Sequence, residues 1–268
     1  MPSGTSDATP EGERLAAARG NLRDALGSVK NLLRGLQSVR VGPRSIEGVL
    51  PEVGDSGAAI EANIRIVLEA VAKRLPGGRA AVDELLDWIA PRTRELERTL
   101  VGASGKPVNA KARLALEQSV ARLCLELEVG RALVDLLDDA VSGSHVALEL
   151  SDFLRNAAMS HGDGAQIKVG IEPGLSGEVS VNPRVCGLVL GIGASLVHRH
   201  TQSTPIVRRG SDSCLVIEVG DSLAEIVSLP TLSLVEPTLA CARAAADGCS
   251  SRLEWDESIP RVSLLMSA

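Results

Sequence analysis

The chain has four histidines, the side chains best suited to proton transfer near neutral pH. His145 follows a Ser-Gly-Ser turn and His161 lies in a Ser-His-Gly-Asp-Gly loop, so we expect both to be solvated. His198 and His200 stand at the end of an apolar helical run, where a cation interacts favourably with the helix dipole. No spacing typical of Ser-His-Asp catalysis is evident, and we predict no catalytic residue.

The five cysteines do not form a pattern typical of a metal or redox site. They include no Cys-x-x-Cys pair, they are odd in number, and no histidine stands at the short spacing of zinc ligands. Most have apolar neighbours, which favours small buried thiols in a reducing compartment. We therefore predict no metal and no cofactor. The five are Cys124, Cys186, Cys214, Cys241 and Cys249.

Three carboxylates, Asp135, Asp138 and Asp139, cluster near the end of a predicted helix. Such a cluster has the groups for acid–base chemistry, but it is also typical of a solvated turn. We favour the solvated turn.

Composition and charge exclude several classes of function. The 268 residues carry a net charge of −6, which disfavours a surface that binds phosphate backbones. Only 1% of the residues are aromatic, too few for the stacking platforms that bind single-stranded nucleic acid. The polar N-terminus lacks the apolar stretch of a signal peptide, and no run of about 18 apolar residues spans a membrane. We expect a cytoplasmic protein.

The first half of the chain predicts long amphipathic helices. Apolar residues recur with helical spacing over 11–39, 56–75 and 109–141, and over 79–100 with an interruption at Pro91. Short connections favour an antiparallel helical bundle, whose broad apolar faces suggest a homodimer. We expect three parts: a disordered N-terminus at 1–10, the bundle at 11–144 and a second domain at 145–268.

The second half predicts strands and helices in one layered domain. Residues 178–200 read as a strand, a turn and a helix, with Asn182 as the N-cap and Pro183 in the first helical turn. A further helix is predicted at 238–248. This order favours an α/β sandwich with helices on one face of a mixed sheet, so the chain as a whole is α+β. The other strands are predicted at 166–173, 214–221, 251–256 and 261–267.

From about Leu148 onward, this order resembles the ATP-binding domain of sensor histidine kinases, the GHKL or Bergerat fold. In that family a central helix carries two asparagines that hold Mg²⁺ and the phosphates. Ile192 and Leu196 stand where those asparagines belong. Because Mg²⁺ requires oxygen ligands, the resemblance implies a degenerate site that binds no nucleotide.

Two other motifs of the family are also altered. Asp221 matches the aspartate that reads adenine, but the glycines that accompany it are missing. The later glycine-rich phosphate loop is replaced by a segment with Glu236, whose charge repels phosphate. The residues between them, 225–232, leave room for only a short nucleotide lid.

The resemblance extends into the helices. The family's phosphorylated helix matches residues 19–26, where Gly20 stands at the position of the histidine and Ala25 at that of the proline. The extra helical segment at 45–101 departs from the family pattern. The resemblance implies a surface near this motif for a receiver domain or a histidine kinase. The candidate contact residues are Arg19, Gly20, Asn21, Arg23 and Asp24.

These observations favour a catalytically inactive, dimeric adaptor of two-component signal transduction, a pseudokinase that acts through protein–protein interaction. One alternative is a histidine phosphotransfer protein that lacks ATP binding. Another is an assembly scaffold that reuses the kinase fold, and a third is an enzyme with an unconventional nucleotide site.

Overall fold

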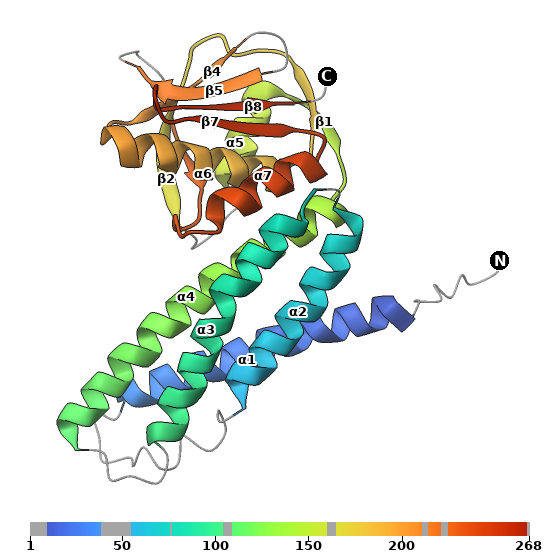
Figure 1. Ribbon diagram of the computed structural model, residues 1–268. Coiled ribbons are helices and arrows are strands. Elements are labelled where there is room, and N and C mark those ends of the chain that lie inside the picture. The colour runs from blue at the N-terminus through green and yellow to red at the C-terminus, as the bar shows by residue number, and fades with distance from the viewer. Residues whose placement is uncertain are drawn as a thin grey trace, which may run out of the picture. The chain divides into compact units, whose positions relative to one another are not determined.

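The computed structural model describes residues 10–38, 55–75, 77–103, 109–159, 165–210, 214–220 and 225–266. Chain contacts divide it into two compact units (Figure 1). The first contains the described residues up to Ala70 together with Leu86–Arg131. The second contains Val71–Leu85 and the described residues from Ala132 onward. Residues 71–85 and 132–144, which we assigned to the bundle, belong to this second unit.

The N-terminal part is helical, as the periodicity predicts. The helices are α1 (Pro10–Ser38), α2 (Ser56–Arg74), α3 (Arg79–Ala103) and α4 (Ala110–Ser142). The Asn109 side chain accepts a hydrogen bond from the Ala112 N–H at 2.9 Å, which caps α4. Pro10 already belongs to α1, and the other residues expected to be a disordered N-terminus lie outside the described residues.

Polar contacts within the first unit align neighbouring helices. The Thr93 hydroxyl of α3 donates to Glu61 of α2 at 3.0 Å, and Lys30 of α1 pairs with Glu128 of α4 at 3.0 Å. Two ion pairs join α3 to α4, namely Arg92 with Glu126 at 3.0 Å and Arg122 with Glu95. Because the residue number rises on α3 as it falls on α4, these two helices run antiparallel.

Pro91 does not interrupt α3, contrary to our prediction. Proline removes one helical N–H and crowds the carbonyl one turn earlier, so it usually kinks or ends a helix. Here the Arg92 guanidinium donates to the Trp88 carbonyl and lies 3.7 Å from the centroid of the Trp88 ring. The same guanidinium pairs with Glu126 of α4. The side chain that follows Pro91 therefore contacts both the preceding turn of α3 and the neighbouring helix.

The C-terminal part is a mixed α/β domain. The elements, in chain order, are β1 (Val146–Glu149), α5 (Leu150–Met159), β2 (Gln166–Ile171), β3 (Glu178–Val181), α6 (Pro183–Thr201), β4 (Pro205–Arg209), β5 (Cys214–Val219), β6 (Glu225–Pro230), α7 (Thr238–Gly248), β7 (Arg252–Asp256) and β8 (Arg261–Leu265).

Six strands form the main sheet in the order β6-β2-β4-β5-β8-β7. Strands β2 and β4 are parallel and the other neighbours are antiparallel, while β1 and β3 form a separate antiparallel pair. The expected α+β class, with N-terminal helices and a mixed C-terminal sheet, is confirmed.

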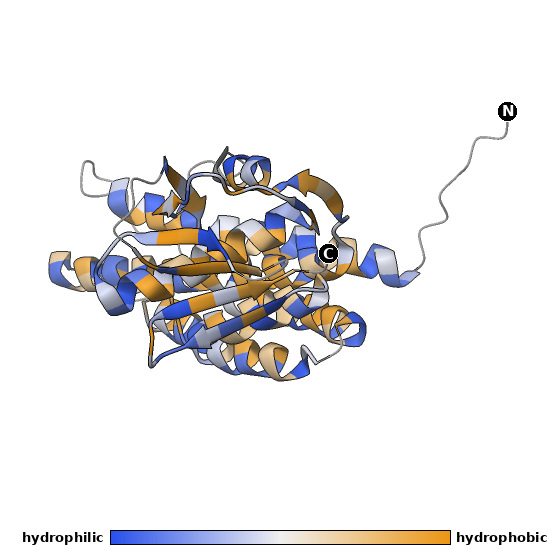
Figure 2. Ribbon diagram, turned by 90° about the horizontal axis from the view of Figure 1, so that it is seen from above, coloured by the Kyte–Doolittle hydropathy of each residue, from blue (hydrophilic) through white to orange (hydrophobic). Residues whose placement is uncertain are grey.

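Helices α6 and α7 lie against the sheet, where Figure 1 shows them on one side of β5, β8 and β7. Strand β8 shows why this side is the core: Val262 and Leu264 are buried, while the alternating residue Arg261 is exposed. Figure 2 shows hydrophobic and hydrophilic residues both occurring along the strands. The core of the domain therefore lies between the sheet and its helices.

Strands β1, β4 and β6 and helix α5 are elements that we did not predict. The most consequential is β6, because it lies in residues 225–232, where we expected room for only a short nucleotide lid. Residues 225–230 pair antiparallel with β2 along its whole length and form one edge of the sheet, so they leave still less room for a lid.

Candidate functional site around helix α6 and the loop before α7

Helix α6 is the central helix of the domain, and its N-terminus is capped as predicted. The Asn182 Oδ1 accepts from the Val185 N–H at 3.3 Å, and Pro183 lies in the first turn. The helix ends at Gln202, which has a left-handed conformation with φ of 56°. Ile192 is fully buried and Leu196 is half-buried. Ile192 therefore belongs to the core and presents no atom to a ligand.

Glycines let α6 approach its neighbours closely. A Cβ added at Gly191 would lie 1.8 Å from the Pro230 carbonyl oxygen, and one at Gly187 would lie 2.9 Å from the Ala157 Cβ. Next along the helix, Ser195 shares a hydrogen bond of 2.8 Å with the Thr231 hydroxyl. The last residue of β6 and the residue after it thus lie directly on α6, at Gly191 immediately before Ile192 and at Ser195 about one turn after it.

The loop before α7 bonds to itself through Thr238, a residue that sequence reasoning missed. The buried Thr238 hydroxyl donates to the Ser233 carbonyl at 3.0 Å and accepts from the Val235 N–H at 3.0 Å. The Thr238 N–H donates to the Val235 carbonyl at 3.0 Å, and Pro237 has no N–H. Anion sites at helix N-termini are made of such N–H groups, and at Val235, Pro237 and Thr238 they are used internally or absent.

Glu236 is exposed on the same loop, immediately before the N-cap Pro237 of α7. A carboxylate at that place repels phosphate. Asp221, the candidate adenine contact, lies outside the described residues. Of the four degenerate nucleotide-site positions, the structure brings Ile192 and Leu196 together on α6 and places Glu236 beside α7.

The end of α4 is tied to the start of α6, a contact that the sequence did not predict. The Asn182 Nδ2 donates to the Asp139 carbonyl at 3.1 Å, and the Asp139 carboxylate pairs with Arg184 at 3.0 Å. A Cβ added at Gly143 would lie 1.9 Å from the Asn182 Nδ2. Of the acidic cluster predicted to be a solvated turn, Asp139 is therefore an ion-paired residue that joins two helices.

The histidines that the structure describes act as local hydrogen-bond donors or ring contacts. The His145 Nε2 donates to the Cys249 carbonyl at 3.1 Å, and the His198 Nδ1 donates to the Ser203 carbonyl at 2.9 Å. The ring of His200 lies 5.1 Å from that of Trp255, between centroids. His145, His198 and His200 are exposed, and His161 lies outside the described residues.

The predicted burial of the thiols is confirmed for Cys124, Cys186, Cys241 and Cys249, whereas Cys214 is half-buried. Burial raises the pKa of Cys186 to about 11, and it raises those of Cys241 and Cys249 to about 12. Such thiols are not nucleophiles at neutral pH. Over the described ranges, no three His, Cys, Asp or Glu side chains cluster so as to hold a metal ion.

The candidate partner surface lies on α1. Asn21, Arg23 and Asp24 are exposed, while Arg19 and Gly20 are half-buried. Leu22 and Leu26, the two leucines that match the family motif, are buried on the opposite side of the helix. Three of the five candidates are thus open to a partner protein.

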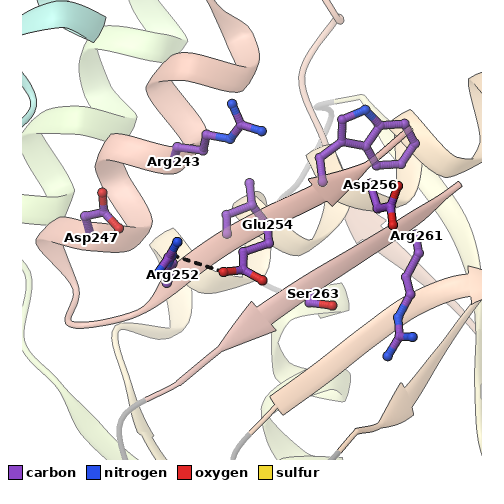
Figure 3. A pocket seen from close by; sticks show the side chains of 9 residues that line it. Arg243, Asp247, Arg252, Glu254, Asp256, Arg261 and Ser263 are labelled. Carbon is purple, nitrogen blue, oxygen red and sulfur yellow. Dashed lines mark ion pairs between the residues drawn. The ribbon is translucent and has the colours of Figure 1, made fainter. Parts of the chain in front are cut away.

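Sequence reasoning also missed a hollow of about 580 Å³ at the end of the sheet. Figure 3 shows Arg243 and Asp247 of α7 beside Arg252 and Glu254 of β7, with an ion pair between the last two. The alternation of exposed charges along β7 is the signal that indicates a polar strand here. Charges of both signs line the hollow, namely Arg243, Asp247, Arg252, Glu254, Asp256 and Arg261.

Comparison with known proteins identifies no relative: no protein-family model matches the chain, and no curated protein matches it. Within the part that the structure describes, every helix is too short or too polar to cross a membrane.

Proposed function

We propose that the chain is a catalytically inactive relative of sensor histidine kinases that acts as a dimeric adaptor in two-component signalling. The observation that carries the proposal is the loop before α7, where the N–H groups of Val235 and Thr238 are bonded within the loop and Pro237 has none, so these three positions offer no free N–H to a phosphate. The burial of Ile192 supports it, because chain atoms cover one of the two α6 positions at which the resemblance places the ligands of Mg²⁺ and phosphate.

The element order also supports the proposal. A mixed sheet carries one parallel strand pair, β2 with β4, and α6 packs against it as the central helix. The resemblance implies a sandwich with a central helix on a mixed sheet, and this arrangement supports it. The departures from the family fall at the positions that would touch ATP, so on this proposal the fold is kept while the chemistry of the site is lost.

Thermal melting with Mg-ATP tests the inactive site. A ligand that binds only the folded state raises the melting temperature as its concentration increases. We expect no shift with Mg-ATP or Mg-ADP and no transfer of the γ-phosphate to the protein. A saturable rise in melting temperature would contradict the proposal, and it would favour the unconventional enzyme instead.

The adaptor activity is tested on α1. Purified receiver domains and histidine kinases are measured for binding to the full chain and to a variant with Arg23→Glu and Asp24→Arg together. We expect at least one of them to bind, and the double reversal to abolish that binding. Arg34→Glu, at another exposed position of α1, is the matched control. Failure of every receiver and kinase to bind would overturn the adaptor.

The phosphotransfer alternative requires a histidine on a rigid helix, and α1 to α4 contain none. His145 is the nearest along the chain, and it follows α4 with its Nε2 bonded to a backbone carbonyl. The structure therefore offers no specific observation in favour of this alternative.

A further inference from the structure

Strand β7 is an open edge of the main sheet. It stands last in the strand order, pairs with β8 on one flank, and has no strand on the other flank among the described residues. In an antiparallel pair, alternate residues direct their N–H and C=O groups away from the partner strand. An edge strand thus presents backbone groups that can pair with a further strand.

Two exposed side chains on this edge carry opposite charges. Arg252 and Glu254 lie on the same face of the strand, with an ion pair of 3.1 Å between them. The intervening Leu253 is buried toward the helices. Charges of a single sign would keep sheet edges apart, whereas a cation and an anion two residues apart are attracted to the same pair of a second edge in the correct register.

The charges that line the hollow along β7 limit which kind of partner can bind there. Three arginines and three carboxylates line it, so a nucleic acid or a uniformly acidic peptide would meet repelling carboxylates, and a basic peptide would meet arginines. Charge complementarity therefore favours an occupant that itself carries both signs. The segment Arg252-Leu253-Glu254 of a second copy carries them.

We propose that β7 pairs antiparallel with β7 of a second copy about a two-fold axis at Leu253, which joins the two main sheets edge to edge. An isologous interface must be self-complementary, and this register places Arg252 of each copy opposite Glu254 of the other. The four side chains form a quartet in which every neighbour has the opposite charge.

The hydrogen bonds of the Asp256 carboxylate favour this register. Its carboxylate accepts from the Ser258 hydroxyl at 2.6 Å and from the Ser258 N–H at 2.9 Å, so it is engaged in its own turn. A pairing centred on Glu254 would place Arg252 opposite this engaged carboxylate and would place the two Glu254 side chains against each other. The Leu253-centred pairing avoids both.

The interface is independent of the proposed adaptor function and of any dimer through the bundle. If the bundle also dimerises, two different two-fold contacts in one chain build tetramers or longer assemblies. Loss of the β7 contact then leaves the dimer that forms through the bundle. Because the readout is the mass of the assembly, this loss is distinguishable from a loss of nucleotide or receiver binding.

The test uses the full chain with Arg252→Glu or Glu254→Arg and measures mass by light scattering over a concentration series. Each single variant places like charges opposite each other, and we expect it to lose the β7 contact and to have a lower mass than the wild type at the same concentration. In an equal mixture of the two variants, every cross-strand pair again has opposite charges, so we expect the wild-type mass to return. The double variant Arg252→Glu with Glu254→Arg should behave like the wild type.

Lys168→Glu, an exposed reversal on the interior strand β2, is the matched control and should leave the mass unchanged. All the changed side chains are exposed, so we expect every variant to fold, and thermal melting checks this. A wild-type chain that stays monomeric, single variants that keep the wild-type mass, or a mixture that fails to recover it would overturn the proposal.

Discussion

Asn182 joins two helices of the second unit through one side chain. Its Oδ1 accepts from the Val185 N–H at 3.3 Å and caps α6, while its Nδ2 donates to the carbonyl of Asp139 near the end of α4 at 3.1 Å. The residue is 4% exposed, so both bonds are shielded from water. A side chain that the sequence indicates only as a helix cap is also the link between α4 and α6.

Replacing Asn182 by Ala removes the cap and the link together. We expect the free energy of unfolding to fall by about 1–3 kcal/mol, since a lost N-cap costs about 1 kcal/mol and the Asp139 carbonyl loses one of its two donors, the other being the Gly143 N–H. Gly143→Ala should have a similar effect because its Cβ would meet the Asn182 Nδ2. Urea denaturation measures both.

The two changes act on the same contact, so their effects should not add. In the Asn182→Ala background, Gly143→Ala should cost less than it does alone, although the Asp139 carbonyl still lies 2.7 Å from the added Cβ. Full additivity would show that Gly143 and Asn182 do not act through each other.

Gly191→Ala tests the close approach of α6 to the end of β6. The new methyl group would lie 1.8 Å from the Pro230 carbonyl oxygen, a backbone atom that cannot rotate away. We expect a loss of about 1–3 kcal/mol in the free energy of unfolding. Gly27→Ala on α1 is the matched control, because its Cβ would meet nothing within 4 Å. There alanine should stabilise by about 0.5–1 kcal/mol through higher helix propensity.

Thr238→Val keeps the shape of the side chain and removes the hydroxyl that closes the loop before α7. The buried hydroxyl links the Ser233 carbonyl to the Val235 N–H, which would keep only the Ser233 carbonyl as acceptor, so we expect destabilisation of about 1–3 kcal/mol in chemical denaturation. Thr201→Val removes bonds to the Val197 carbonyl and from the Ser203 N–H at the less buried end of α6, and it should cost less. Equal losses would indicate that the Thr238 bonds are no stronger than a local helix contact.

Because its thiols are buried, we expect the free energy of unfolding of the protein to decrease at alkaline pH. Burial raises the pKa of Cys241 and Cys249 to about 12 in the folded chain, from about 9.0 when exposed. Above pH 9 the unfolded chain releases these protons while the folded chain keeps them. The free energy of unfolding therefore falls as pH rises from 9 toward 12, and the full stabilisation is present below pH 9.

Cys241→Ala should make this decline less steep in denaturation experiments between pH 8 and about 11. In the native protein at pH 8, a maleimide should label the half-buried Cys214 first. Rapid labelling of Cys241 without unfolding would show that its site opens readily, which would contradict the predicted alkaline effect.

Local patterns were sufficient for the long helices and for four of the sheet strands. The bounds of α7 and the cap of α6 agree with the predictions, because helix hydrogen bonds join residues that are close in sequence. The predicted interruption at Pro91 was wrong, and the Arg92 side chain beside it bonds Glu126 of α4, a contact that local sequence does not show. Strand β6 was not predicted because its partner, β2, is distant in the chain.

The sequence by itself determined which residues are apolar, where helices begin, and that Ile192 and Leu196 carry no oxygen ligand for Mg²⁺. Only the tertiary structure decided that Thr238 closes the loop before α7, that Pro230 lies on Gly191, and that β7 is an open edge with Arg252 and Glu254 exposed on it. The physical reason is the range of the interactions. Capping and helical periodicity act over one or two turns, whereas strand order and close packing depend on segments that meet only when the whole domain folds.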